Sequence, residues 1–135
     1  MSYPILSIEG VGPALAEKLK AAGIATTAAL LEKAKDPKGR KALAGETGID
    51  ERKILKFANM ADLMRINGVG EEYSELLEAA GVDTVKELKT RNVANLTKAM
   101  AEANETKKLV RLAPSEKTVE KWVEQAKSLP PVMTY

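Results

Sequence analysis

The chain of 135 residues contains the same segment twice, and this repeat restricts its fold more than any other feature. When the sequence is shifted by 58 residues, Ile8–Leu30 aligns with Ile66–Leu88, and 11 of the 23 aligned positions are identical. Further along, Asp50–Met64 aligns with Ser115–Leu129 at an offset of 65. Self-similarity at a nearly fixed spacing indicates two copies of one structural unit.

The two copies divide the chain into a first repeat over residues 1–65, a second repeat over residues 66–129 and a frayed tail over residues 130–135. The length fits one ordinary domain, or two small halves that share a core. Because the offset grows from 58 to 65, seven additional residues fall in the second copy, between Asn92 and Pro114.

Both copies have the composition of helices. Ala, Leu, Glu and Lys are abundant and aromatic residues make up only 4% of the chain. These residues lose little side-chain freedom in a helix, and no segment alternates convincingly with the period of two that strands require. We therefore predict an all-α fold with helices over residues 13–22, 27–35, 39–44, 51–64, 71–80, 85–88, 96–104 and 116–129. Asn95 is the expected cap of the seventh helix, and a short additional helix within Lys107–Ala113 remains open.

The side chains on which most enzymes and metal sites depend are missing. The chain has no His and no Cys, which excludes thiol nucleophiles, thiolate or imidazole metal ligands and imidazole acid–base catalysis. Glu71 and Glu72 are adjacent in a helix and point to different sides, and no Gly-rich phosphate loop followed by Lys-Ser/Thr occurs. We predict a protein that is not an enzyme and that binds no cofactor and no metal.

No segment of the sequence predicts contact with a membrane. The first ten residues lack the basic region and long apolar run of a signal peptide, and no apolar run approaches the roughly 20 residues of a membrane span. We expect a cytoplasmic protein.

Two glycine corners stand at the start of the aligned segments. Corner 1, Ile8–Gly12, reads IEGVG, and corner 2, Ile66–Gly70, reads INGVG. Glycine permits backbone conformations that other residues avoid, so two helices can approach closely, while the valine between the glycines points back to the core. Each corner ends where a helix begins, and there the free amide groups and the positive end of the helix dipole attract anions.

Both corners, with the residues around them, resemble the helix-hairpin-helix motif, in the segments SIEGVGPALAEKLKAAGI and RINGVGEEYSELLEAAGV. That motif binds the nucleic-acid backbone without reading its sequence. Two such motifs in one chain resemble the tandem helix-hairpin-helix domain, a compact SAM-like helical fold found in DNA repair, recombination and polymerase proteins. The stand-alone duplicated chain is also similar to an uncharacterised bacterial family of helix-hairpin-helix proteins.

The resemblance implies that the backbone amides of Gly10, Gly12 and Ala14 meet a phosphate, with Gly68, Gly70 and Glu72 as their equivalents in corner 2. Members that bind DNA well usually carry Lys or Arg about two residues after the last glycine. This chain departs from that pattern, because it has Ala14 and Glu72 at those positions.

Charge separates the two corners, although the net charge of the chain is only +2. Corner 1 is followed by Lys18 and Lys20, with Glu17 opposing them. Corner 2 is followed by four glutamates: Glu71, Glu72, Glu75 and Glu78. Their carboxylates interact favourably with the helix dipole, and their negative charge takes the place of the phosphate that this dipole would attract. We predict that corner 2 is structural, while phosphate contact and a structural use remain equally open for corner 1.

Three other features have two interpretations each. The basic run from Lys33 to Lys41 extends a nucleic-acid surface or is a solvated loop between short helices. Phe57 and Trp122 occupy equivalent positions, where core packing is the stronger expectation and base stacking the weaker. Tyr73, after corner 2, covers that corner or contacts a partner.

Two functions remain open. The first is weak, salt-dependent and sequence-nonspecific binding of a DNA or RNA backbone. Its predicted contacts are Gly10, Val11, Gly12, Ala14, Lys18, Lys20, Lys38, Arg40 and Lys41, with Gly68, Val69 and Gly70 as the structural set of corner 2. The second is a protein-interaction or adaptor domain that keeps the fold without binding nucleic acid and meets its partner through residues such as Tyr73 and Glu72.

Overall fold

The computed structural model describes residues 2–135, and its regular structure is helical, as predicted. An isolated bridge between Pro4 and Thr26 is its only extended pairing within those residues. The elements in chain order are η1 (Ile5–Ser7), α1 (Pro13–Ala21), α2 (Thr27–Ala34), α3 (Pro37–Thr47), α4 (Glu51–Leu63), α5 (Glu71–Ala79), α6 (Val85–Leu88), α7 (Val93–Lys107) and α8 (Glu116–Ser128).

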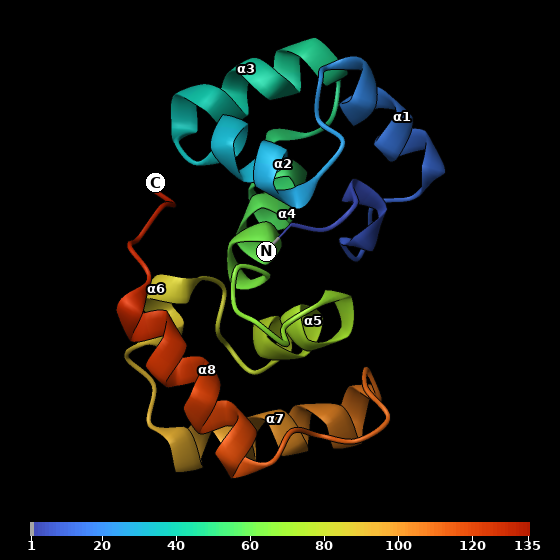
Figure 1. The fold of residues 1–135 in the computed structure, drawn as a ribbon. Helices are drawn as coiled ribbons and strands as arrows, with labels where there is room; N and C mark the ends of the chain where they lie inside the picture. The colour runs from blue at the N-terminus through green and yellow to red at the C-terminus, as the bar shows by residue number, and fades with distance from the viewer. Residues whose placement is uncertain (1) are drawn as a thin grey trace.

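The helices form two lobes, one above the other in Figure 1. Lobe 1, residues 2–65, contains η1 and α1–α4, and lobe 2, residues 66–129, contains α5–α8. Each lobe has its own hydrophobic core, so the two halves do not share one. α4 connects them: Ile54, Phe57 and Ala58 belong to the core of lobe 1, whereas Leu63 belongs to that of lobe 2.

The order of helices is the same in both lobes, and two helix pairs match in length. α1 and α5 have 9 residues each, and α4 and α8 have 13 each. The third helices differ, because α3 has 11 residues and α7 has 15. Phe57 on α4 and Trp122 on α8 are buried, as expected for core aromatics.

Two helices begin earlier than the sequence predicts, because a side chain further towards the N-terminus caps each of them. The Asp36 carboxylate accepts a hydrogen bond from the Gly39 amide at 2.7 Å, so α3 begins at Pro37 and takes in Lys38, which lies before the predicted helix over residues 39–44. In α7 the cap is Asn92, not Asn95, and its side-chain oxygen accepts from the Asn95 amide at 3.0 Å. Residues 108–113 form no helix.

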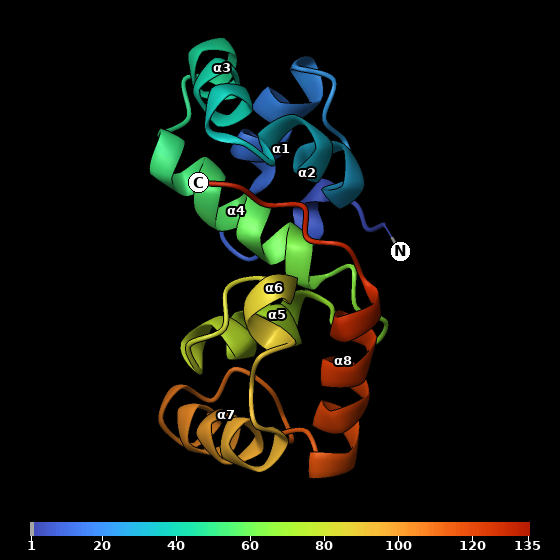
Figure 2. The same ribbon diagram turned by 90° about the vertical axis from the view of Figure 1, so that its left-hand side faces the viewer.

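The segment expected to be a frayed tail packs against lobe 1. This C-terminal strap, residues 130–135, leaves lobe 2 and runs along α4 (Figure 2). Met133 is buried in the core of lobe 1, and the Thr134 amide donates to the Lys35 carbonyl at 2.8 Å. The Tyr135 hydroxyl donates to Asn59 Oδ1 at 2.9 Å. The strap is therefore a second physical connection between the lobes.

A buried carboxylate forms a third connection. Asp62, at the end of α4, is 1% exposed. Its Oδ1 accepts from Arg65 Nη1 at 2.8 Å, and its Oδ2 accepts from the Val85 amide at the start of α6, also at 2.8 Å. Arg65 also donates to the Pro130 carbonyl at 2.8 Å, which joins this contact to the strap.

Candidate nucleic-acid interface

The first glycine of each corner is required by the backbone. Gly10 has φ 94° and Gly68 has φ 92°, in the left-handed region that favours glycine. A Cβ on Gly10 would lie 3.1 Å from Phe57 Cε1, and one on Gly68 would lie 3.3 Å from Trp122 Nε1. Each corner is thus pressed against the aromatic residue of its lobe.

The second glycine of each corner has no such requirement. Gly12 has φ −86° and Gly70 has φ −106°, conformations that other residues adopt. A Cβ on either glycine would meet no heavy atom within 4 Å. Glycine at these positions keeps the surface open at the start of α1 and α5, where a ligand can approach the backbone closely.

The starts of α1 and α5 also differ from those of the other α-helices in residues 2–135. Gly12 and Gly70 offer no capping side chain. Elsewhere a side chain accepts a backbone hydrogen bond at the N-terminus; the capping residues are Thr26, Asp36, Asp50, Thr84, Asn92 and Ser115. In α1 the first bond within the helical pattern runs from the Ala16 amide to the Gly12 carbonyl, at 2.9 Å, and the amides of Ala14 and Leu15 have no acceptor within the described chain. Corner 1 therefore presents open donors to solvent.

Charge around corner 1 favours an anion on one side and opposes it on the other. The first turn of α1 has no acidic residue. Lys18 lies one turn beyond Ala14 on the same side of α1, whereas Lys20 projects from a different side, because helical positions repeat every 3.6 residues. Glu9, within the corner itself, is exposed and carries the opposing charge.

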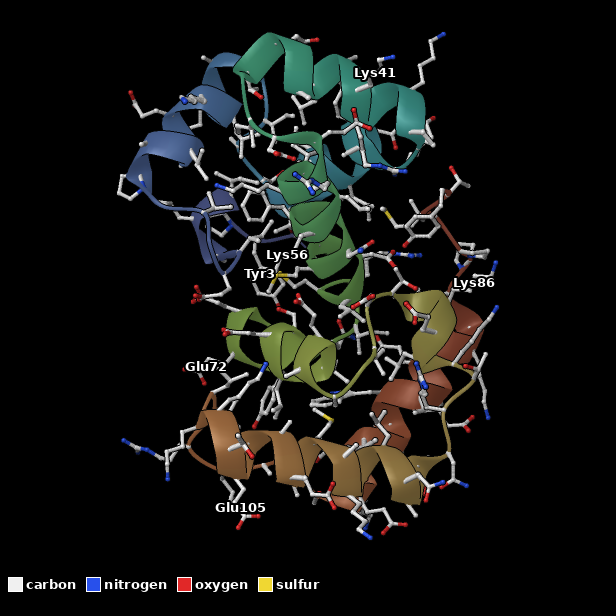
Figure 3. All side chains as sticks on the ribbon, turned by 180° about the vertical axis from the view of Figure 1, so that it is seen from behind. Tyr3, Lys41, Lys56, Glu72, Lys86 and Glu105 are labelled. Carbon is white, nitrogen blue, oxygen red and sulfur yellow. The ribbon has the colours of Figure 1, made fainter. Side chains whose placement is uncertain are left out.

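The remaining predicted basic contacts lie elsewhere. Figure 1 shows α3 with its C-terminal end towards α1 and its N-terminal end on the opposite side of lobe 1, where Figure 3 places Lys41. Lys38 is in the same first turns of α3. The structure thus brings together Gly10, Gly12, Ala14 and Lys18, and separates Lys38 and Lys41 from them.

Arg40 is the predicted contact that differs most from expectation. Its side chain is buried, with the residue 4% exposed. The guanidinium donates to the Ala34 carbonyl at 3.0 Å and to the Thr134 carbonyl at 2.8 Å, and it lies over the Tyr135 ring, 5.6 Å from the ring centroid. The sequence alone groups Arg40 with exposed cations, because it does not show which side of α3 faces the strap.

An acidic cluster that the sequence alone does not predict lies between the lobes. Glu9 of corner 1 and Glu75 and Glu78 of α5 line one cavity of about 130 Å³ together with Lys56 and Lys107. Burial, reinforced by the negative charges of Glu9, Glu78 and Glu71, raises the pKa of Glu75. The spacing of the glutamates on α5 is visible in the sequence, but the approach of Glu9 depends on how the lobes pack.

Corner 2 differs from corner 1 in its charge. Glu71 and Glu72 occupy the first turn of α5, and both are exposed. Figure 3 shows Glu72 on the same side of the molecule as α1, at the level of lobe 2. The Asn67 amide in this corner donates to Gln125 Oε1 of α8 at 2.8 Å, which ties the corner to its own lobe.

Comparison with known proteins gives one match. A family profile described as a domain of unknown function, DUF4332, matches residues 9–129. No curated protein and no solved structure matches the chain. The helices that residues 2–135 form are too short or too polar to cross a membrane.

Proposed function

The chain belongs to the DUF4332 family of domains of unknown function, and from the geometry of corner 1 we propose that it binds the phosphate backbone of DNA or RNA without catalysis and without reading base sequence. In this proposal both corners are helix-hairpin-helix elements, and corner 1 is the one that contacts phosphate. The Gly10 corner turns the chain, and the open amides of Ala14 and Leu15 donate to phosphate oxygens.

One observation carries the proposal: α1 begins without a capping side chain, at a glycine that neither backbone conformation nor packing requires. Ser, Thr, Asp or Asn at Gly12 would satisfy the first amides of α1 and stabilise the helix. Their absence leaves donors aligned with the positive end of the helix dipole, where a phosphate is favoured.

The proposed binding is weak, and it depends only modestly on salt because few cations contribute. Lys18 is the cation on the same side of α1 as the open amides, and Glu9 and the acidic cluster oppose an approaching phosphate. Each phosphate that a protein cation neutralises contributes a slope of about −0.9 to the dependence of log K on log salt concentration. We therefore expect a shallow total slope of about −1 to −2.

The most direct test replaces Gly12 with a capping residue. In Gly12→Asp the new carboxylate accepts from the first amides of α1, so the helix is kept or stabilised while the donors are occupied and the charge turns negative. Fluorescence anisotropy of labelled duplex and single-stranded oligonucleotides at about 50 mM and 200 mM salt measures binding. We expect the wild-type protein to bind at the lower salt concentration and the variant to lose that binding, with unchanged or higher Tm.

Two lysine variants on the same helix provide a matched control. Lys18→Gln and Lys20→Gln change the net charge equally, but only Lys18 lies on the side of the open amides. We expect Lys18→Gln to weaken binding more than Lys20→Gln or the double variant Lys38→Gln/Lys41→Gln. Undiminished binding by Gly12→Asp, or no binding by the wild-type protein at low salt, contradicts the proposal.

A further inference from the structure

Trp122 brings an unused hydrogen-bond donor to corner 2. The residue is 3% exposed, and its indole Nε1 lies 3.3 Å from the position that a Cβ on Gly68 would take. No acceptor in the described chain takes the Nε1 hydrogen, although a buried indole N–H usually has a partner. Within residues 2–135, every fully buried side-chain nitrogen has a hydrogen-bond partner. The Trp122 Nε1 has none, so it is not fully buried and reaches solvent beside Gly68.

Packing alone does not require the donor. Phe57 fills the equivalent place in lobe 1, where its ring packs against Gly10 with a similar clearance and has no polar atom. In lobe 2 the indole packs against Tyr73, with 5.2 Å between ring centroids, while its N–H edge faces the corner. A phenyl ring would therefore be enough to fill this position, and the indole of Trp122 adds a hydrogen-bond donor to it.

The groups around this donor define the chemistry of an acceptor. α5 starts at Gly70 without a capping side chain, and the amides of Glu71 and Glu72 have no acceptor within the described chain. The exposed carboxylates of the same two residues make the surface negative, which disfavours a phosphate and favours a cation. A ligand that suits all of these groups presents a neutral oxygen to the amides and the indole, and positive charge to the carboxylates.

We propose that corner 2 docks a basic, extended peptide segment of a partner protein. A backbone carbonyl of that segment accepts the Trp122 Nε1 hydrogen, and its Lys or Arg side chains pair with Glu71 and Glu72. The partner is identified by this chemistry: carbonyl oxygens are plentiful along an extended peptide, and the lysines complement the charge of α5. The site is separate from the phosphate contact of corner 1 and does not depend on it.

The only Trp in the chain provides a direct probe of the site. An amide–nitrogen correlation NMR spectrum of the labelled full chain contains one indole N–H resonance, which reports on the Trp122 donor. The probe peptide is an acetylated and amidated peptide of alternating Gly and Lys, and its control has Glu in place of each Lys. We expect the lysine peptide to shift the indole resonance downfield in a saturable manner and to shift the amides of Glu71 and Glu72, while the glutamate peptide shifts none of them.

Variants separate this site from general attraction between opposite charges. The double variant Glu71→Gln/Glu72→Gln removes the charge, and Glu105→Gln, on the outer face of α7 in Figure 3, is the matched control for an exposed glutamate. We expect the double variant to weaken binding of the labelled lysine peptide by about tenfold, and Glu105→Gln to leave it nearly unchanged. Trp122→Phe keeps the packing that Phe57 shows in lobe 1, and we expect it to weaken binding by about threefold.

Several outcomes overturn the proposal. They are binding of the lysine peptide without a shift of the indole resonance, equal binding of the glutamate peptide, and equal weakening by Glu105→Gln. A downfield indole shift with a duplex oligonucleotide but not with the lysine peptide also overturns it, and makes corner 2 a phosphate site. Gly12→Asp, which blocks corner 1, is expected to leave the peptide response intact, so failure of one site is distinguishable from failure of the other.

Discussion

At the scale of single residues, the two glycines of each corner have different roles. Gly10 and Gly68 hold left-handed backbone against an aromatic ring, so they are required by the fold. Gly12 and Gly70 have ordinary φ angles and open space around them, so the fold does not require glycine there, and in our proposals they leave the backbone open to a ligand. The stability of variants at these glycines, measured without any ligand, distinguishes the two roles.

We predict that Gly10→Ala destabilises the protein and Gly12→Ala does not. A left-handed conformation costs a residue with a side chain about 1–2 kcal/mol, and the Cβ that Gly10→Ala introduces adds crowding against Phe57 Cε1 at 3.1 Å. Gly12→Ala is expected to change the free energy of unfolding by less than about 0.5 kcal/mol. Urea unfolding followed by circular dichroism measures both, and equal losses for the two variants would show that Gly12 is also structural.

The acidic cluster gives a prediction about pH. Because the pKa of Glu75 is raised in the folded protein, folding favours its protonated form. That stabilisation is fully present below the pKa of the unfolded chain and is lost as the pH rises through the folded pKa. We expect Glu75→Gln to have a higher Tm than the wild-type protein at pH 7, and the difference to disappear below about pH 4. A Tm series over this range checks it; an unchanged Tm at pH 7 at low salt contradicts it.

At the scale of helices, a boundary is predictable from the sequence where neighbouring residues set it. Pro13 starts α1, and α4 and α8 begin at the predicted residues 51 and 116, directly after the capping residues Asp50 and Ser115. α3 and α7 begin earlier than the sequence predicts, because Asp36 caps α3 directly before Pro37, and Asn92, three residues before the expected cap Asn95, caps α7. In α7, Asn92 precedes Asn95 and captures its amide, so the earlier asparagine defines the helix.

The same distinction, between features set by neighbouring residues and features set by packing, applies to the candidate site. Corner 1 could be located from the sequence because its glycines and the start of α1 are contiguous. The basic residues of α3 could not be placed relative to corner 1, because the direction of α3 depends on packing against α2 and α4. Arg40 could not be recognised as buried, since one of its acceptors, the Thr134 carbonyl, is 94 positions away along the chain.

The junction of α4 and α6 yields a prediction at this scale. Asp62→Ala leaves the Val85 amide and Arg65 without their buried acceptor, and we expect a loss of about 3 kcal/mol in unfolding free energy. Asp62→Asn retains an oxygen for one of the two donors and is expected to cost clearly less. Denaturant unfolding of the three proteins tests the order, and equal stability of Asp62→Ala and the wild-type protein would contradict a role for this carboxylate in joining the lobes.

At the scale of the whole molecule, two lobes with separate cores are joined by α4, by the Asp62 contacts and by the C-terminal strap. Lobes with separate cores can move relative to each other unless such contacts restrain them. The acidic cluster lies across this junction, so the distance of Glu75 and Glu78 from corner 1 depends on the restraint. We infer that the strap, by restraining the two lobes, affects how closely the carboxylates of α5 approach corner 1.

We predict that removing the buried anchor of the strap loosens it selectively. Met133→Ala deletes a buried side chain from the core of lobe 1, which typically costs about 2–5 kcal/mol. Because the strap lies at the chain end, it can detach and so remove part of the cavity that the smaller side chain leaves. We therefore expect a loss in unfolding free energy at the lower end of that range. Hydrogen exchange should then be accelerated at the Thr134 amide, which donates to the Lys35 carbonyl, while amides within α8 remain protected. Leu112→Ala, at a side chain 78% exposed, is the matched control and should change neither stability nor exchange. Uniformly faster exchange throughout both lobes in Met133→Ala would mean that the strap is part of a single cooperative unit, and not a separate restraint between two lobes.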